Sequence, residues 1–310
     1  MTRPSIQLSI GGRDLALLTL AAASWGIGTV VSKRAVDEIP PFTLLPVQLA
    51  ASLVVLVVLM RMSRMPVHGA PPVLARLGIL NPGIAYALGL IGLTWISASL
   101  AVLLWALEPL LILLLAGIFL REGITPDLVG LSLVAAVGMV LILFDPALGG
   151  AWPGVVLTLI GVACCAAYSI IARRFVAHSD STAQVVLAQQ TYALGFAVAV
   201  ALIVTAVGGE TSLAGVSAIG MVSAVVSGVL YYAAAYWFYL SALRRVPASI
   251  AATSFYLIPI FGVAAGVLAL GDRLDPIQWL GVATVAVAVV LIALRPSRAP
   301  GAEPEAAATA

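Results

Sequence analysis

Most of this chain consists of apolar stretches that are long enough to cross a lipid bilayer. A spanning helix needs about 20 predominantly apolar residues, and ten such stretches follow one another along the 310 residues. With 62% hydrophobic and 9% charged residues, the chain has more apolar side chains than a water-soluble domain could bury. We therefore predict an all-α integral membrane protein with ten transmembrane helices. The expected spans are 15–31, 42–60, 77–96, 98–120, 128–144, 152–171, 183–207, 219–243, 249–270 and 277–294.

Charge and cysteine content exclude two classes of protein. The net charge is only +2, and the lysines and arginines form no sustained patch of the kind that nucleic-acid binding requires. Cys164 and Cys165 are adjacent within an apolar stretch, so they lack the spaced partners of a metal site and are interpreted as small core residues. We expect no nucleic-acid partner, no bound metal and no cofactor.

The basic residues predict how the chain is oriented in the membrane. Cytoplasmic loops of membrane proteins carry the excess of lysine and arginine. With the N-terminus inside, twelve of the fifteen basic residues fall on the cytoplasmic side, and only Lys33, Arg34 and Arg273 fall outside. We therefore expect a multi-pass protein of the cytoplasmic membrane with both termini inside, a first span that is not cleaved, and a disordered tail at 295–310.

The chain also contains an internal repeat. Residues 98–126 and 248–276 align without a gap, and Pro109 of the first copy then matches Pro259 of the second. Each copy is a hydrophobic helix that is interrupted by its proline. Matched prolines, tyrosines and acidic residues in one order favour a true repeat over chance similarity among apolar helices.

The repeat divides the chain into two halves of opposite orientation. Each half, 14–144 and 151–294, holds five expected spans. Because five is odd, the second half must enter the membrane from the opposite face. Inverted repeats of this kind are the arrangement that many secondary transporters use for alternating access.

The ends of the fourth and ninth spans carry a recognisable pattern. Residues 120–126 read Leu-Arg-Glu-Gly-Ile-Thr-Pro and residues 270–276 read Leu-Gly-Asp-Arg-Leu-Asp-Pro, so that Asp272 replaces Glu122. With the mid-span prolines and the glycine-dotted spans that follow, this pattern resembles the EamA repeat of the drug/metabolite transporter (DMT) superfamily. Within that superfamily the chain is similar to bacterial aromatic amino acid exporters of the YddG type, which are proteins of the inner membrane.

The resemblance covers nearly the whole chain and also predicts which spans line the substrate path. It implies that spans one to four and six to nine enclose the substrate path, while spans five and ten stand outside it. The pattern specifies the fold better than the substrate.

Glu108 is the foremost candidate for a functional residue. It lies about ten residues from either end of its span, and a carboxyl at that depth costs about 3 kcal/mol or more unless it faces a cavity, finds a partner or stays protonated. We expect it to bind a substrate ammonium or carry a proton; the alternative is a protonated acid bonded to a neighbouring helix. Its repeat counterpart is Ile258, so its role is not shared by the two halves.

The matched prolines point to the binding site. Pro109 and Pro259 are expected to kink their helices and to free a backbone carbonyl toward a cavity. Proline-interrupted segments at corresponding positions of two halves are the best sequence pointer to the site of a transporter. Trp105 and its counterpart Phe255 lie one turn before these prolines and are expected to line the cavity.

Mid-span tyrosines are further candidates. Tyr86 and Tyr236 lie near the middle of spans three and eight, and a buried tyrosine hydroxyl needs a partner, so they either line a polar cavity or bond between helices. Tyr232 shares the helix face of Tyr236, whereas Tyr231 and Tyr239 are expected to pack.

Other polar and aromatic residues complete the candidate set. Trp25, mid-span in the first helix, either stacks on a planar ligand or packs in the core. Asn81 precedes a Pro-Gly pair, the signature of a helix N-cap; it marks either a carboxylate site or an ordinary cap. Gln48, Gln189 and Gln190 add polarity to spans two and seven, and we expect one or two of them to face the path.

These features predict a secondary transporter that exports small metabolites, above all amino acids including aromatic ones. A DMT-type exporter of another neutral or cationic metabolite or drug is the alternative. A sugar-phosphate carrier is disfavoured, because no lysine or arginine lies mid-span. No GxxxxGK[ST] loop occurs, so a substrate or ion gradient must drive transport.

An enzyme is the remote alternative, and we expect none. His68 and His178 fall in loops, and the spans contain no HExxH or GxSxG motif. The GxxxG pair Gly262 and Gly266 is expected to pack helices within one chain, which favours a monomer in contact with membrane lipid.

Overall fold

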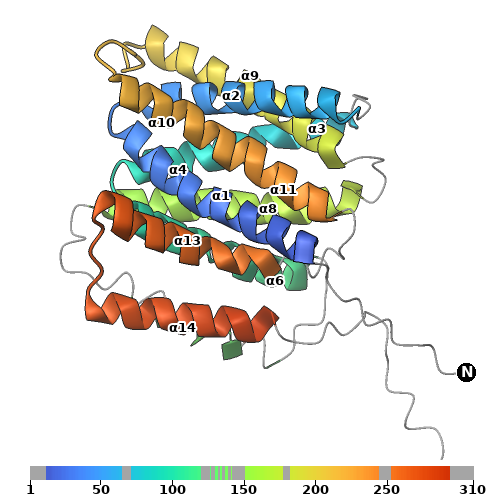
Figure 1. The fold of residues 1–310 in the computed structure, drawn as a ribbon, viewed down its shortest axis with the longest axis vertical. Coiled ribbons are helices and arrows are strands. Elements are labelled where there is room, and N and C mark those ends of the chain that lie inside the picture. Colours follow the sequence, from blue (N-terminus) through green and yellow to red (C-terminus); the bar gives the residue numbers. More distant parts are fainter. Residues whose placement is uncertain are drawn as a thin grey trace, which may run out of the picture.

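The described chain is a bundle of helices that run alongside one another (Figure 1). The computed structural model describes residues 12–64, 71–119, 151–176, 182–243 and 253–293, with single residues between 126 and 141. Every regular element in these ranges is helical, which confirms the predicted class. The elements are α1 (Gly12–Val36), α2 (Pro41–Met62), α3 (Pro72–Gly78), η1 (Ile79–Ile84), α4 (Ala85–Leu93), α5 (Ala98–Trp105), α6 (Glu108–Phe119), α8 (Trp152–Val176), α9 (Thr182–Ala206), α10 (Ala218–Gly228), η3 (Val229–Ala234), α11 (Ala235–Leu243), η4 (Thr253–Leu257), α13 (Ile258–Ala265), η5 (Gly266–Leu270) and α14 (Pro276–Ala293).

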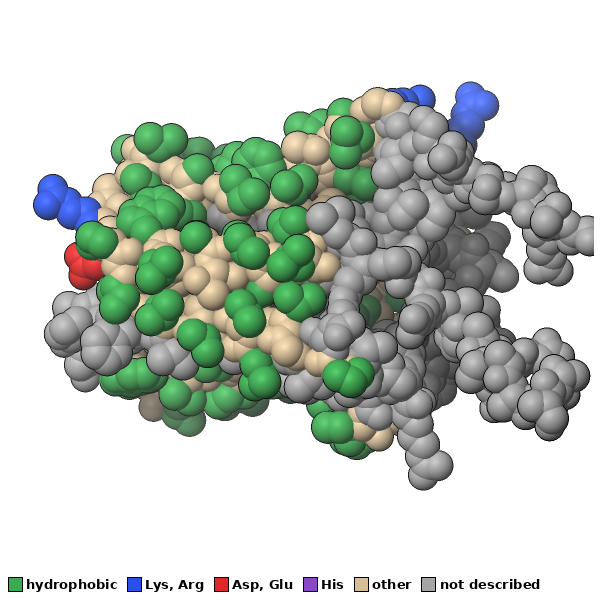
Figure 2. Space-filling view, turned by 90° about the horizontal axis from the view of Figure 1, so that it is seen from below, with side chains coloured by type: hydrophobic (Ala, Val, Ile, Leu, Met, Phe, Trp, Pro, Cys, Tyr) green, Lys and Arg blue, Asp and Glu red, His purple; other side chains and the backbone are tan. Residues whose placement is uncertain are grey.

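The surface and the helix lengths are those of a membrane protein. Five described stretches are long and apolar enough to cross a bilayer, and three shorter apolar helices accompany them. Figure 2 shows apolar side chains along the side of the bundle, with charged side chains visible only at its ends. The count of ten spans remains a prediction, because most of the expected fifth span at 128–144 lies outside the described residues. The long stretches are Gly12–Val36, Pro41–Met62, Pro72–Leu93, Ala183–Ala206 and Ala218–Tyr239.

The internal repeat is visible as matched interruptions of the helices. The π-helical segments η1 and η3 are both six residues long, and they begin 150 residues apart, at Ile79 and Val229. Helix α5 ends at Trp105 and α6 begins at Glu108, next to Pro109; in the second half, η4 gives way to α13 next to Pro259. The same places in both halves are therefore bent.

The two halves run in opposite directions. Lys33, in the last turn of α1, donates a 2.9 Å hydrogen bond to the carbonyl oxygen of Leu93 at the end of α4. Gly154, near the start of α8, packs against Trp95, just beyond the same end of α4. The end of α1 and the start of its counterpart α8 thus lie at the same end of the bundle. The start of α1 and the end of α14 lie together at the other end (Figure 1).

The core lies between the halves rather than within each of them. Helix α1 packs against α10, α11 and α13, α2 against α9, α4 against α8, and α5 against α13. Every one of these pairs joins the first half to the second. The main hydrophobic cluster accordingly draws Leu49 and Leu103 from the first half, and Val155, Ala193 and Tyr232 from the second.

Glycines allow the closest of these approaches. A Cβ atom added at Gly228 would lie 2.5 Å from the carbonyl oxygen of Gln48, and Gly78 is pressed in the same way against the backbone of Gln189. Gly78 and Gly228 are again 150 residues apart, so the same glycine-to-glutamine contact occurs twice. Each one brings a helix of one half onto a helix of the other.

The GxxxG pair of α13 and η5 packs within the chain. A Cβ atom at Gly262 would lie 2.6 Å from the side chain of Val102 in α5, and Gly266 faces Ser99 of the same helix. Next to it, Asp272 accepts a 2.9 Å hydrogen bond from the backbone nitrogen of Ser99. Asp272 therefore caps a helix of the other half. Its counterpart Glu122 lies outside the described residues.

Candidate functional site

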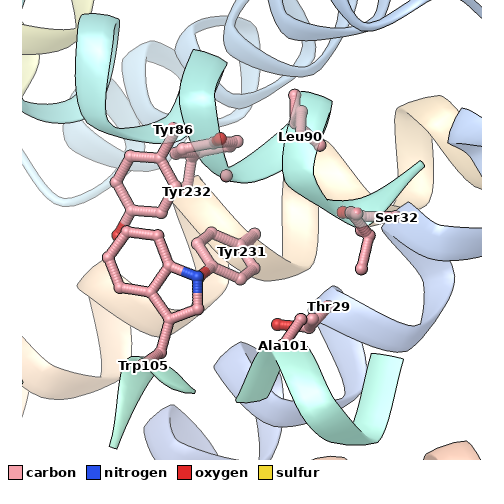
Figure 3. A pocket seen from close by; sticks show the side chains of 10 residues that line it. Thr29, Ser32, Tyr86, Leu90, Ala101, Trp105, Tyr231 and Tyr232 are labelled. Atoms are coloured by element: carbon pink, nitrogen blue, oxygen red, sulfur yellow. The ribbon is translucent and has the colours of Figure 1, made fainter. Parts of the chain in front are cut away.

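A cavity lies where helices of the two halves meet (Figure 3). It has a volume of about 30 Å³, whereas a single water needs about 10–15 Å³ by the same measure. The cavity therefore has room for about two water molecules. The lining residues are Thr29 and Ser32 of α1, Tyr86, Gly89, Leu90 and Leu93 of α4, Ala101 and Trp105 of α5, and Tyr231 and Tyr232 of η3.

One wall of the cavity is aromatic. The rings of Tyr86 and Trp105 are stacked, with centroids 5.2 Å apart and planes at 14°. Tyr231 and Tyr232 meet the Tyr86 ring edge-on, at 5.2 Å and 5.3 Å. Gly89 has no side chain, and the Trp105 indole lies directly against it. The wall offers a flat, apolar surface with phenolic hydroxyls at its edge.

Three residues named from the sequence are found in this lining, namely Tyr86, Trp105 and Tyr232. Tyr231, which was expected only to pack, lines the cavity as well. On a regular α-helix the neighbouring residues 231 and 232 would face different directions. The π-helical segment η3 winds more widely, and both rings reach the cavity.

Three other candidates form an adjacent aromatic cluster. Trp25 meets Tyr236 at 5.4 Å, Phe255 at 5.3 Å and Tyr239 at 6.0 Å, each ring edge to face. These residues pack with Ala21 and Ala235. Tyr231 also packs against this cluster, so the cluster continues the aromatic wall.

Glu108 lies near both aromatic groups. It is the first residue of α6, directly after the interruption at the end of α5. Its carboxyl lies within electrostatic range of Tyr86 of the cavity and of Tyr236 of the adjacent cluster. Cys165 and Tyr168 of α8 are within the same range. The ion pairs of the described chain do not include Glu108. An intramembrane acid placed in this way is suited to binding a cation or a proton.

Asn81 interrupts its helix but stands apart from the cavity lining. Its backbone has φ −143° and ψ 117° between helical residues, so the helix restarts after it, where the Pro-Gly pair predicted a cap. The side chain is 8% exposed, and its Oδ1 has no hydrogen-bond partner in the described structure.

Buried glutamines connect the lining to neighbouring helices. Gln48 Nε2 donates to Ser32 Oγ (3.0 Å) and to Ser227 Oγ (2.7 Å). Gln190 Nε2 donates to the carbonyl oxygen of Tyr232, and its Oε1 accepts from Ser52. Sequence reasoning did not single out Thr29 or Ser32, although Thr29 follows Trp25 by four residues and Ser32 follows it by seven, which places all three near one helix face.

The fold and the site together define a class of protein. Two inverted halves made of apolar helices meet around a polar and aromatic cavity, and helices of both halves are interrupted beside it. This is the architecture of secondary transporters.

Comparison with known proteins identifies the family. The chain belongs to the EamA-like transporter family, whose model matches residues 14–144 and 152–294. This match confirms the family that the sequence pattern indicated. The chain is 24% identical over 264 residues to an uncharacterized transporter of Archaeoglobus fulgidus, covering 83% of this chain and 90% of that protein. A solved crystal structure of a protein shares the fold, with a TM-score of 0.66, 18% identity, and coverage of 94% of this chain and 99% of the other.

Proposed function

We propose that this chain is a secondary transporter that exports amino acids, including aromatic ones, across the cytoplasmic membrane of a bacterium. The observation that carries the proposal is the stacked pair Tyr86 and Trp105, which walls a cavity between inverted halves and lies near the half-buried acid Glu108. A planar ring or a branched aliphatic side chain fits against such a wall. A carboxylate next to it suits an ammonium group.

Transport requires this cavity to open. A volume of about 30 Å³ is too small for any amino acid, so substrate enters only when the lining helices move apart. The lining comes from α1, α4 and α5 of one half and from η3 of the other, so that a rocking of one half against the other would change its volume. The interruptions next to Pro109 and Pro259 give α5, α6 and α13 places to bend.

The proposed orientation places the end of the bundle that holds the end of α1 and the start of α8 outside the cell. Lys33, Arg34 and Arg273 belong to that end, while twelve basic residues belong to the other side. The N-terminus and the C-terminal tail then lie in the cytoplasm. Export follows from the resemblance to amino acid exporters rather than from the geometry of the site.

Export of a cationic metabolite or drug is a second candidate function. The observation that favours it is the pairing of aromatic faces with Glu108, which suits a lipophilic cation as well as an amino acid. The two candidates differ in what the substrate carries besides its ammonium group. An amino acid brings a carboxylate, whereas a lipophilic cation does not.

Counterflow in liposomes tests the proposal. Purified protein is reconstituted, loaded with an unlabelled amino acid, and assayed for uptake of the same labelled amino acid at two pH values, with lipophilic cations tested in parallel. We expect saturable counterflow of phenylalanine, and a loss of about tenfold or more in Glu108→Gln, since that change removes the charge that receives the ammonium. Glu210→Gln, on an exposed loop, is the matched control and should leave counterflow unchanged.

The outcomes separate the candidates. Counterflow of cations without amino acids supports the alternative, and movement of neither class contradicts both. If neither pH nor Glu108→Gln alters a measurable counterflow, Glu108 has a structural role.

A further inference from the structure

Ser32 and Thr29 are the two hydroxyl-bearing residues of α1 in the cavity lining, and their protons are used differently. Thr29 Oγ1 donates to the carbonyl oxygen of Trp25, one turn earlier (3.2 Å). For Ser32, the bond recorded in the described structure is the one that its Oγ accepts from Gln48 Nε2. A serine hydroxyl has one donor and two acceptor positions. The proton of Ser32 therefore remains available to a group in the cavity.

The direction of the bond between Gln48 and Ser32 follows from a third residue. Ser227 Oγ donates its single proton to the carbonyl oxygen of Ala224 (3.0 Å), so it accepts from Gln48 at 2.7 Å. With the Ser227 proton on the Ala224 carbonyl, the atom of Gln48 that faces Ser227 is the nitrogen, and the same nitrogen faces Ser32 at 3.0 Å. In this orientation Gln48 Oε1 has no hydrogen-bond partner in the described structure. Gln48 is fully buried, and Gly228 packs closely against its backbone.

We propose that Ser32 donates a hydrogen bond to the carboxylate of the substrate, and that Gln48 is the positioning residue that keeps the Ser32 proton directed into the cavity. This inference rests on the proposed function, because it names the group that recognises one end of the amino acid. The chemistry favours a carboxylate: a hydroxyl donor in a poorly solvated cavity binds a charged acceptor more strongly than a neutral one. The side chain of the substrate amino acid then packs against the aromatic wall.

Comparison of an acid with its amide tests the inference. Unlabelled L-phenylalanine and L-phenylalaninamide each compete against counterflow of labelled L-phenylalanine. We expect Ser32→Ala to weaken competition by the acid about tenfold and competition by the amide about twofold, because only the acid loses a charge-assisted bond. Gln48→Met, which has a similar shape but no donor, should shift the acid-to-amide ratio in the same direction.

Two controls distinguish positioning from general damage. Gln189→Met alters the equivalent buried glutamine of the second half, which bonds to Tyr168 and Leu74, and it should leave the ratio unchanged. Adding Gln48→Met to Ser32→Ala should not shift the ratio further. Equal losses for acid and amide, or a ratio that Gln189→Met changes as much as Gln48→Met does, would overturn the inference. A wild-type protein that moves no amino acid contradicts the proposed function itself.

A second inference comes from the end of the bundle where α1 ends. Glu38, between α1 and α2 of the first half, accepts a 2.9 Å hydrogen bond from the backbone nitrogen of Ser217, the N-cap of α10 in the second half. Asp272, from the second half, accepts a 2.9 Å bond from the backbone nitrogen of Ser99 in the first turn of α5. Each carboxylate thus lies at the positive N-terminal end of a helix of the other half.

A further contact joins the halves at the same end. Thr43 Oγ1 of α2 donates to the carbonyl oxygen of Thr211 (2.9 Å). Glu38 is held as a carboxylate, since its bonds with Ser217 lower its pKa below the ordinary value, helped by the nearby Arg34. The crossed arrangement means that the halves cannot separate at this end while both carboxylate contacts persist.

We infer that Glu38 and Asp272 form a clasp that keeps this end of the cavity closed, and that its release is the step that opens the cavity to the outside. Cysteine labelling tests this without a known substrate. Ala101→Cys, in the cavity lining, is introduced with Cys164→Ala and Cys165→Ala, and a membrane-impermeant maleimide is added to intact cells. The combination of Glu38→Gln and Asp272→Asn should raise the labelling rate about tenfold, since two charge-assisted bonds become neutral ones.

The control is Asp37→Asn on the same surface. Asp37 pairs with Lys33 of its own helix (3.2 Å) and does not bridge the halves, so its change should leave labelling unchanged. Leu90→Cys, elsewhere in the lining, serves as a second reporter if the first variant folds poorly. No rise at either position, or an equal rise with Asp37→Asn, would overturn the clasp. A rise seen only in inverted membrane vesicles supports the clasp and contradicts the proposed orientation.

Discussion

At the scale of residues, the site depends on which side chains share one cavity. Tyr86 and Trp105 come from different helices, and their stack exists because Gly89 leaves room for the indole against α4. Glu108 lies just beyond Trp105, at the interruption between α5 and α6. Removal of the side chain of Tyr86, Trp105 or Glu108 should therefore change substrate recognition rather than the stability of the whole fold.

Trp105→Ala should reduce recognition of aromatic substrates. The stacked pair contributes about 0.5–1.5 kcal/mol beyond simple burial, so we expect the half-saturation concentration for phenylalanine to rise about three- to tenfold, and that for alanine to change little. Counterflow of both amino acids in liposomes measures the difference. Trp95→Ala, at an exposed position outside the cavity, is the control. Equal losses for both substrates would show that the indole acts on folding and not on selection.

At the scale of elements, glycine contacts and capping carboxylates decide how helices of opposite halves meet. The contacts of Gly78 and Gly228 with Gln189 and Gln48 bring backbones together, and the interruptions at η1 and η3 turn the same helices. Close backbone contacts tolerate no added atom, whereas contacts at helix ends respond to charge.

Gly228→Ala should destabilise the protein. Its Cβ would lie 2.5 Å from the Gln48 carbonyl oxygen, and overpacking of this kind costs about 1–3 kcal/mol. Gly195→Ala, in α9 with nothing within 4 Å, should instead be neutral or stabilise by about 0.5–1 kcal/mol through helix propensity. Thermal unfolding of both variants in detergent gives the comparison. If both variants shift the midpoint equally, packing at Gly228 is not the cause.

The contact between Glu38 and Ser217 should make stability depend on pH in the acidic range. Because the bonds with Ser217 lower the pKa of Glu38 below 4.5 in the folded state, the stabilisation is present above that ordinary value and is lost as pH falls through the lowered pKa. Wild type should therefore unfold at a higher temperature than Glu38→Gln at neutral pH, and the difference should vanish under strongly acidic conditions. A difference that persists in acid would assign the effect to shape rather than to charge.

At the scale of the whole molecule, the inverted repeat brings the start of α1 and the end of α14 to the same end of the bundle (Figure 1). From the distribution of basic residues we predict that this end faces the cytoplasm. Green fluorescent protein, which matures only in the cytoplasm, should fluoresce when fused to either end of the chain. Alkaline phosphatase, which folds only outside, should stay inactive at both. Fluorescence at one end and phosphatase activity at the other would contradict the orientation.

The sequence by itself determined the class of the protein, its repeat and most of its helix interruptions. These are local properties: a bilayer forces each span to satisfy its own backbone hydrogen bonds over about 20 apolar residues, and a proline in the interior of a helix removes a backbone donor and favours a bend there. Matching Pro109 with Pro259 therefore also predicted where the helices of the two halves are interrupted.

Only the tertiary structure decided which side chains share the cavity. Tyr231 joins Tyr232 there because η3 is wound as a π-helix, whereas Trp25, Tyr236 and Phe255 gather beside it. The rotation of each helix is set by its contacts with the opposite half, such as Gly228 on Gln48. Those contacts join residues far apart in the chain, and hydrophobic patterning in an apolar span does not specify them, because lipid and protein neighbours are equally apolar.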